Sequence, residues 1–122
     1  MKRVEVLLPP AAFDEVKDAL LDLGVDSMTL SEVKHIDPGT RRREVFRGST
    51  YVVDFALRVR IDLVVNDAIV PRIVDEVTKV LERAGSEATN VVVSEVVEVV
   101  RIPTKGSARG RGNRSGPLLR SA

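Results

Sequence analysis

A polar stretch at residues 37–55 gathers the side chains best suited to recognise a partner or an anion. It reads DPGTRRREVFRGSTYVVDF, and the residues in it that carry chemistry are Arg41, Arg42, Arg43, Arg47 and Tyr51. Guanidinium groups pair with carboxylates and phosphates, but no nucleophile–base pair or general acid accompanies them. A loop of this length is uncommon inside a compact domain and is usually kept for function. The stretch therefore predicts a segment that contacts a partner, and it argues against an enzyme.

The composition excludes several classes of protein. The 122 residues include no cysteine, which rules out disulfides and thiolate metal sites. The opening MKRVEVLLPP is too short in its apolar part for a signal peptide. No apolar run approaches the roughly 20 residues that a membrane-spanning helix needs. We therefore expect a single soluble, cytoplasmic domain without a metal site.

The charges are unevenly distributed along the chain. Residues 1–102 carry 14 Lys and Arg against 18 Asp and Glu, a net charge of −4, whereas residues 103–122 carry 5 basic residues and no acid. This pattern predicts a folded domain at 1–102 and a disordered, Gly/Ser-rich tail at 103–122. Arg–Gly repeats can bind nucleic acid, but the tail has no aromatic residue for stacking. A solubilising end, or an arm that docks on a cleft or partner, is favoured over nucleic-acid binding.

Hydrophobic periodicity predicts the secondary structure. Apolar alternation predicts strands at 2–8, 26–36, 57–65 and 90–101. Helical spacing of apolar residues predicts a first helix that starts near Pro10 and ends near residue 23, with Gly24 as its cap. A second helix is expected after an Asp67 N-cap, with Pro71 in its first turn.

The order β-α-β, long loop, β-α-β fits a ferredoxin-like α+β fold. In that fold a four-stranded antiparallel sheet carries both helices on one face. The other face is expected to carry Leu7, Ile61, Val64 and Val92. Because water is a poor environment for so many apolar side chains, we expect this face to be covered in an oligomer. The plan is common and assigns no function.

Particular residues are more specific than this plan. The stretches VEVLLPPAAFDEVKDALLDLGVDSMTLSEVK, EVFRGSTYVVDF and RVRIDLVV closely resemble the PII signal-transduction family, over roughly residues 1–102. Residues 37–55 match the family's T-loop, by which its members engage target enzymes and transporters. FRGSTY at 46–51 nearly matches the T-loop signature. The resemblance implies a homotrimer that binds adenine nucleotides in three clefts between its subunits.

The resemblance also implies which residues would bind the nucleotide. Thr29 matches the family's threonine at the adenine and ribose. Met28, Leu63 and Val64 lie in matching segments whose backbone lines the cleft in the family.

The phosphate positions of the family match poorly. Arg101 is retained, but Asn90, next to Thr89, replaces the family's lysine, and Glu87 replaces a glycine. A hydrogen bond to a charged group is worth about 1.5–3 kcal/mol. Two lost contacts therefore cost roughly 3–6 kcal/mol, or about 10²- to 10⁴-fold in affinity. We expect ADP or AMP to bind better than ATP, unless Arg41–Arg43 fold in to compensate.

The family's 2-oxoglutarate site is altered as well. Its magnesium-binding glutamine falls on Gly39, which has no side-chain oxygen, and its lysine falls on Arg58. Arg58 and Arg47 remain candidate ligands for an anion. We expect no 2-oxoglutarate sensing of the family's kind. Relatives that depart similarly are associated with inorganic-carbon uptake, which makes bicarbonate a candidate effector.

Several alternatives stay open at this point. Tyr51 is either nucleotidylated, as in some family members, or an unmodified contact residue. Arg41–Arg43 either bind an acidic partner or phosphates, or they are a solvated loop. Thr29 either contacts adenine or is simply a strand former. The chain is either a nucleotide-responsive regulator of a transporter or enzyme, or a trimeric interaction module that has lost nucleotide sensing.

Overall fold

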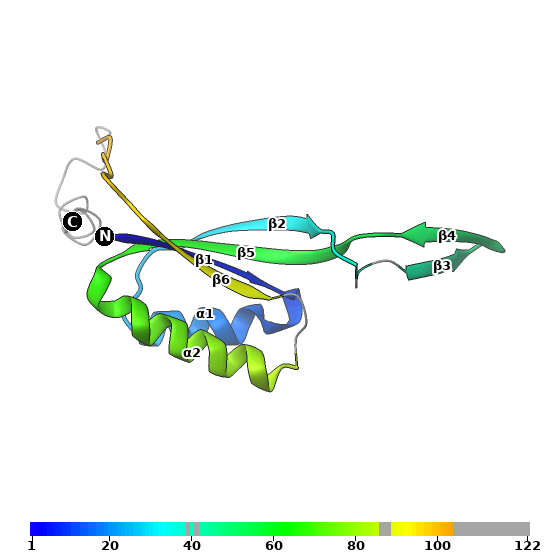
Figure 1. The fold of residues 1–122 in the computed structure, drawn as a ribbon, viewed down its shortest axis with the longest axis horizontal. Coiled ribbons are helices and arrows are strands. Elements are labelled where there is room, and N and C mark those ends of the chain that lie inside the picture. Colours follow the sequence, from blue (N-terminus) through cyan, green and yellow to red (C-terminus); the bar gives the residue numbers. More distant parts are fainter. Residues whose placement is uncertain (39, 41, 86–88, 104–122) are drawn as a thin grey trace.

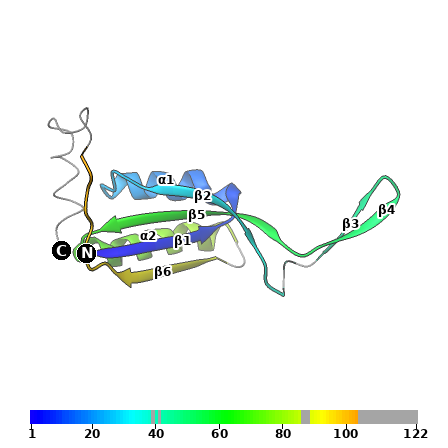
Figure 2. The ribbon, with the colours of Figure 1, turned by 90° about the horizontal axis from the view of Figure 1, so that it is seen from above.

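The computed structural model describes residues 1–38, 40, 42–85 and 89–103. In chain order the elements are β1 (Lys2–Leu8), η1 (Pro10–Ala12), α1 (Phe13–Asp22), β2 (Thr29–His35), β3 (Arg42–Phe46), β4 (Ser49–Val53), β5 (Ala56–Val65), η2 (Asp67–Ile69), α2 (Val70–Arg83) and β6 (Asn90–Glu95). An antiparallel sheet in the order β2-β5-β1-β6 carries both helices on one face, and β3 and β4 form a separate ribbon that projects beyond the sheet (Figures 1 and 2). The predicted ferredoxin-like fold is confirmed.

The core lies between the helices and one face of the sheet. It is built by alternate residues of the two central strands, because successive side chains of a strand point to opposite faces. These residues, exposed by 2% or less, are Val4, Val6 and Leu8 of β1 and Ile61, Leu63 and Val65 of β5. The helices contribute Val16, Leu20, Ile73 and Val77 to the same cluster. A slip of one residue between β1 and β5 would turn this set toward water, so the core fixes the register of the two strands.

Helix α1 ends at a glycine with a positive φ. Gly24 has φ 93°, and its N–H donates to the carbonyl of Leu21 at 3.0 Å. The N–H of Val25 donates to the carbonyl of Leu20 at 3.1 Å, which completes a Schellman motif. The predicted cap at Gly24 is therefore confirmed. Neither helix is long and apolar enough to cross a membrane, in the part of the chain described.

The predicted N-cap of the second helix is wrong. Helix α2 follows Ile69 and has no side-chain cap, although Pro71 lies in its first turn as predicted. Asp67 instead accepts a hydrogen bond from the terminal ammonium of Met1 at 2.6 Å, with the Lys2 ammonium 3.6 Å away. The hydrogen bond from that ammonium, helped by Lys2, lowers the pKa of Asp67. The contact between Asp67 and the terminal ammonium therefore stabilises the folded state fully at pH values above the pKa of Asp67 in the unfolded chain. This stabilisation is lost as the pH falls through the lower pKa that Asp67 has in the folded protein.

Two predicted strands are longer than the observed ones. The strand predicted at 90–101 ends at Glu95, because its partner β1 begins at Lys2, directly opposite Glu95. Beyond that point only one hydrogen bond of the described residues continues the pairing, from the Val96 N–H to the carbonyl of Met1 at 3.3 Å. The strand predicted at 26–36 covers only the seven residues of β2. The end of β6 is thus set by the start of β1, whereas β2 begins at Thr29 although β5 continues past the opposite residue, Asp62, to Val65.

The stretch predicted as a loop contains an ordered ribbon. Strands β3 and β4 pair from Arg42 opposite Val53 to Phe46 opposite Ser49. Arg47 and Gly48, with φ 53° and 79°, connect them, and type I′ hairpin turns require positive φ at both positions. Periodicity missed the ribbon because a ribbon that packs on no core needs no alternation of apolar and polar residues.

The second face of the sheet is covered by no described element of this chain. Ile61 was predicted to lie on it, but Ile61 is fully buried beneath the helices, since it shares its side of β5 with Leu63. Leu7 and Val64 do lie on the open face and are half-buried, and Val92 is 46% exposed there. The open face is therefore less apolar than the sequence suggested.

Gly24→Ala should lower the free energy of unfolding by about 1 kcal/mol. An added Cβ meets no atom within 4 Å, so the loss comes from backbone strain alone. Gly24→Asn should lose less, because asparagine tolerates positive φ better than alanine. Urea unfolding followed by circular dichroism measures both. Equal stability of wild type and Gly24→Ala would contradict the assigned backbone conformation.

Candidate functional site

The residues predicted to bind adenine and ribose lie together at one end of the sheet. Met28 and Thr29 lie where the chain enters β2, and Leu63 and Val64 lie near the end of β5. They line a pocket of about 230 Å³, which is completed by Arg3, Ser27, Asp62 and Val99. The side chain of Leu63 is only 2% exposed and belongs to the core, so Leu63 offers the pocket mainly its backbone. Thr29 is exposed and free to contact a ligand.

Thr89 and Asn90, two of the residues predicted near the phosphates, lie elsewhere. Thr89 and Asn90 line a separate depression of about 310 Å³ between α2 and the edge strand β6. Asn90 is opposite Leu7 at the far end of β1, whereas Val64 is opposite Arg3 near its start. Four residues of strand separate these positions, a distance of about 13 Å. Within one chain, Thr89 and Asn90 therefore form one group and Met28, Thr29, Leu63 and Val64 form another, at opposite ends of the sheet.

Two of the predicted cationic residues have hydrogen-bonding capacity left over. The Nε atoms of Arg58 and Arg101 are buried and have no hydrogen-bond partner in the described part of the chain. Arg58 is held in place by Nη1, which donates to the carbonyl of Leu57 at 2.9 Å. A buried donor without a partner costs about 1–3 kcal/mol, so an acceptor supplied by a ligand or another chain would relieve it.

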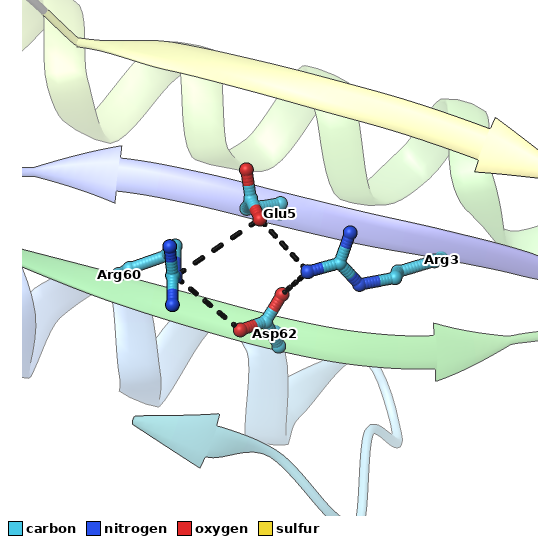
Figure 3. A network of polar contacts seen from close by, with 4 residues as sticks. All are labelled: Arg3, Glu5, Arg60 and Asp62. Carbon is cyan, nitrogen blue, oxygen red and sulfur yellow. Dashed lines mark hydrogen bonds and ion pairs between the residues drawn. The ribbon is translucent and has the colours of Figure 1, made fainter. Parts of the chain in front are cut away.

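Four charged side chains on the open sheet face form a closed network that the sequence reasoning missed (Figure 3). Glu5 and Asp62 lie directly opposite each other on β1 and β5, where like charges repel. Arg3 Nη2 bridges them, 2.8 Å from Glu5 Oε1 and 2.6 Å from Asp62 Oδ1. Arg60 Nε lies 4.0 Å from Glu5 Oε1 and 3.6 Å from Asp62 Oδ2. The four groups together carry no net charge.

A signal for this network was present in the sequence. Arg3 and Glu5 alternate with buried residues of β1, as Arg60 and Asp62 do on β5. The alternation places each pair on the open face. Only the register of the two strands shows that the pairs meet.

Thr40 joins the two chain segments at the base of the ribbon. It is the buried polar residue of the described part, with 7% of its surface exposed. Its Oγ1 lies 2.8 Å from the carbonyl of Asp54 and 2.9 Å from that of Asp37, and it accepts the Asp37 N–H at 3.2 Å. His35 Nε2 lies 3.0 Å from Asp37 Oδ2. Asp-x-x-Thr spacing is typical of a local turn, but the contact to Asp54 has no local signal.

The predicted partner-binding residues are distributed over the ribbon. Arg47 lies at its turn and is exposed. For Arg42, Arg43 and Tyr51 only the backbone, on β3 and β4, is described. Arg41 lies outside the described residues, as do Gly39 and Glu87 of the altered effector and phosphate positions.

Comparison with known proteins decides the family. The family described as nitrogen regulatory protein P-II matches residues 1–106. The chain belongs to the P-II family. It is 33% identical over 104 residues to the nitrogen regulatory protein P-II of Bradyrhizobium diazoefficiens, 35% to that of Azospirillum brasilense and 34% to P-II 1 of Escherichia coli K12. Each match covers 85% of this chain and 93% of the relative. The resemblance predicted from the sequence is confirmed.

P-II proteins are signal-transduction regulators that form trimers and interact with target proteins. In a P-II chain the two groups of predicted nucleotide residues need not meet within one copy. The Thr40 contact lies at the base of the ribbon, where it joins the chain segments that enter and leave it.

Arg3→Met should destabilise this P-II protein by about 1 kcal/mol, because Glu5 and Asp62 would then face each other without their bridging cation. The double variant Arg3→Met/Asp62→Asn should recover part of the loss by removing the repulsion. Urea unfolding at one fixed protein concentration, at low salt and again at 1 M salt, measures both. At 1 M salt, screening of the repulsion between Glu5 and Asp62 should make the stability lost in Arg3→Met smaller. A loss that is unchanged in the double variant would contradict this account of the network.

Thr40→Val should loosen the ribbon while keeping the shape of the side chain. Loss of a hydrogen bond worth about 1 kcal/mol should speed amide exchange in β3 and β4 by about fivefold. Thr50→Val, at an exposed position of β4, is the matched control and should leave exchange unchanged. Hydrogen exchange read by mass spectrometry tests this, and equal exchange in both variants would remove the proposed role of the Thr40 hydroxyl.

Proposed function

We propose that this P-II protein is a cytoplasmic regulator in which an adenine nucleotide, bound between copies of the chain, selects the position of the ribbon. The ribbon in turn contacts a target transporter or enzyme. The observation that carries the proposal is the β3–β4 ribbon, which stands out from the body (Figure 1) in a chain that belongs to a family of regulators.

The ribbon has the properties of a contact surface. Val45 and Val52 are 72% and 51% exposed. They share one face of the ribbon, because Val45 is opposite Thr50 and Val52 lies two residues further along β4. An isolated two-stranded ribbon is marginally stable in water. A partner that covers this face would bury apolar surface and stabilise the ribbon at the same time.

The nucleotide is proposed to bind between copies because one chain supplies only separated parts of the site. The Met28 pocket and the Asn90 depression lie at opposite ends of β1. A second copy of the chain, placed with its Asn90 end beside the first copy's Met28 pocket, would complete the site. This arrangement agrees with assembly as a homotrimer.

The nucleotide is proposed to be ADP or AMP rather than ATP. Asn90 carries no charge where the family has a lysine, and a charge-assisted hydrogen bond to phosphate is worth about 1.5–3 kcal/mol. A third phosphate therefore gains less here than in a site with the lysine. Arg101, with its unpaired Nε, remains as a cation for the shorter phosphate chain.

A role in carbon rather than nitrogen sensing extends this proposal. Arg58 replaces the lysine of the family's 2-oxoglutarate site, and its guanidinium is anchored to Leu57 on one side and unpaired at Nε on the other. A planar guanidinium suits a small planar oxyanion such as bicarbonate.

Isothermal titration of the full chain against AMP, ADP, ATP, 2-oxoglutarate and bicarbonate tests the proposal. We expect binding of AMP or ADP and no response to 2-oxoglutarate. If no adenine nucleotide binds, the proposal of nucleotide sensing is overturned and a trimeric interaction module is favoured. A pull-down compares two baits, the wild-type chain and a variant in which a short glycine linker replaces residues 42–53. The wild-type chain should capture the target, and the variant should not. Capture that survives would overturn the role of the ribbon.

Asn90→Lys should strengthen ATP binding by about 10- to 100-fold, since it restores one charge-assisted contact. AMP binding should change much less, because AMP lacks the outer phosphates. Asn90→Gln is the matched neutral control and should leave the preference unchanged. Titration of the three proteins with AMP and ATP measures the effect, and an equal gain for both nucleotides would place Asn90 away from the outer phosphates.

A further inference from the structure

An apolar depression lies beside the outer edge of the sheet, between α1 and β2. Its volume is about 390 Å³, and it is lined by Lys17, Leu21, Asp26, Ser27, Met28 and Leu30. Leu21 and Leu30 are 50% and 47% exposed, which is high for leucines that share one hollow. Covering them would remove apolar surface from water.

The rim of this α1–β2 groove is acidic. Residues 14–26 carry five acids and one lysine. Glu15 pairs with Arg83 of α2, and Asp14 lies 4.0 Å from Lys17, so Asp18, Asp22 and Asp26 are the acids without an ion pair in the described part of the chain. Asp18 is three residues before Leu21 on the helix, which makes the two side chains neighbours, and Asp26 lines the groove itself. A ligand that suits the groove therefore combines a small apolar group with flanking positive charges.

We propose that the C-terminal tail of the same chain occupies the α1–β2 groove, with Leu118 and Leu119 in the hollow and Arg114 and Arg120 at its acidic rim. Leu118 and Leu119 are the only large apolar side chains of residues 104–122, and that stretch carries five basic residues and no acid. The tail thus has the composition that the groove requires, on the same polypeptide.

The chain passes close to the groove four residues before Pro103. Val99 lines a pocket together with Ser27 and Met28, and these two residues also line the α1–β2 groove. Pro103 and Pro117 are 14 residues apart in the sequence, and a flexible linker of 14 residues would span about 20 Å on average. A tether of this length gives an effective concentration near the millimolar range. Even weak affinity of the leucine pair for the groove would then give substantial occupancy.

Other exposed apolar surfaces suit this tail less well. The depression beside α2 lies next to a helix with three acidic and three basic residues, so it offers no net attraction. The exposed valines of the ribbon lie among arginines of the sequence, which would repel a basic segment. The α1–β2 groove combines exposed leucines with an excess of acidic residues along α1 and the turn that follows it.

The chain has two methionines, Met1 and Met28, and this allows a direct test in the full-length protein. With ¹³C-methyl methionine labelling, Met28 reports on the groove, and Met1, which is buried at 7% exposure, serves as the internal reference. The variant Leu118→Ser/Leu119→Ser should shift the Met28 signal and leave the Met1 signal in place. Raising the salt concentration should move the wild-type Met28 signal toward that of the variant, because screening weakens the charged rim contacts.

A double-mutant comparison separates docking from general effects. Leu21→Ser removes one wall of the groove, so the tail variant should cause little further shift of Met28 in that background. Leu57→Ser, at a 60% exposed leucine of β5 outside the groove, is the control and should preserve the full shift. Identical Met28 signals in wild type and the tail variant would overturn the proposal. A difference that disappears on dilution would overturn it too, because the groove would then hold another molecule's tail. Because Met28 also lines the proposed nucleotide pocket, the spectra are recorded without nucleotide, so that neither result depends on nucleotide binding.

Discussion

The register between β1 and β5 is the constraint on which the other features depend. Val6 and Ile61 are opposite each other and fully buried beneath the helices, so a one-residue slip would expose the central row of the core. Once this register is fixed, Glu5 must face Asp62 on the other side of the sheet. The bridging position of Arg3 follows from the same pairing. Chemistry on the open face is therefore specified by packing on the covered one.

Elements with one buried face could be predicted from the sequence, and those without one could not. The alternation of 57–65 and the apolar stripe of the second helix correspond to β5 and α2, because each has to bury one side. Gly24 was predictable because a helix end with positive φ favours glycine. The β3–β4 ribbon could not be predicted because it packs on no core in the described part of the chain. The last residue of β6 could not be predicted because it is set by where β1 begins, and by no residue of β6 itself.

The candidate site shows a similar division. Met28, Thr29 and Val64 line one pocket because β2 pairs with β5, and their role in nucleotide binding stays a prediction from the family resemblance. Thr89 and Asn90 lie elsewhere, since no single copy brings the two ends of β1 together. The Thr40 contact joins residues 14 positions apart, and local sequence patterns carry no information on such a pairing.

A short base beneath a long ribbon has a mechanical consequence. The ribbon meets the body near Thr40 and Asp54, and its turn at Arg47 and Gly48 lies about seven residues away, roughly 23 Å in extended chain. A tilt of about 10° at the base would carry the tip through about 4 Å, more than the length of a hydrogen bond. The length of the ribbon would therefore magnify any change of angle at the Thr40 contact into a displacement of several ångströms at Arg47 and Gly48.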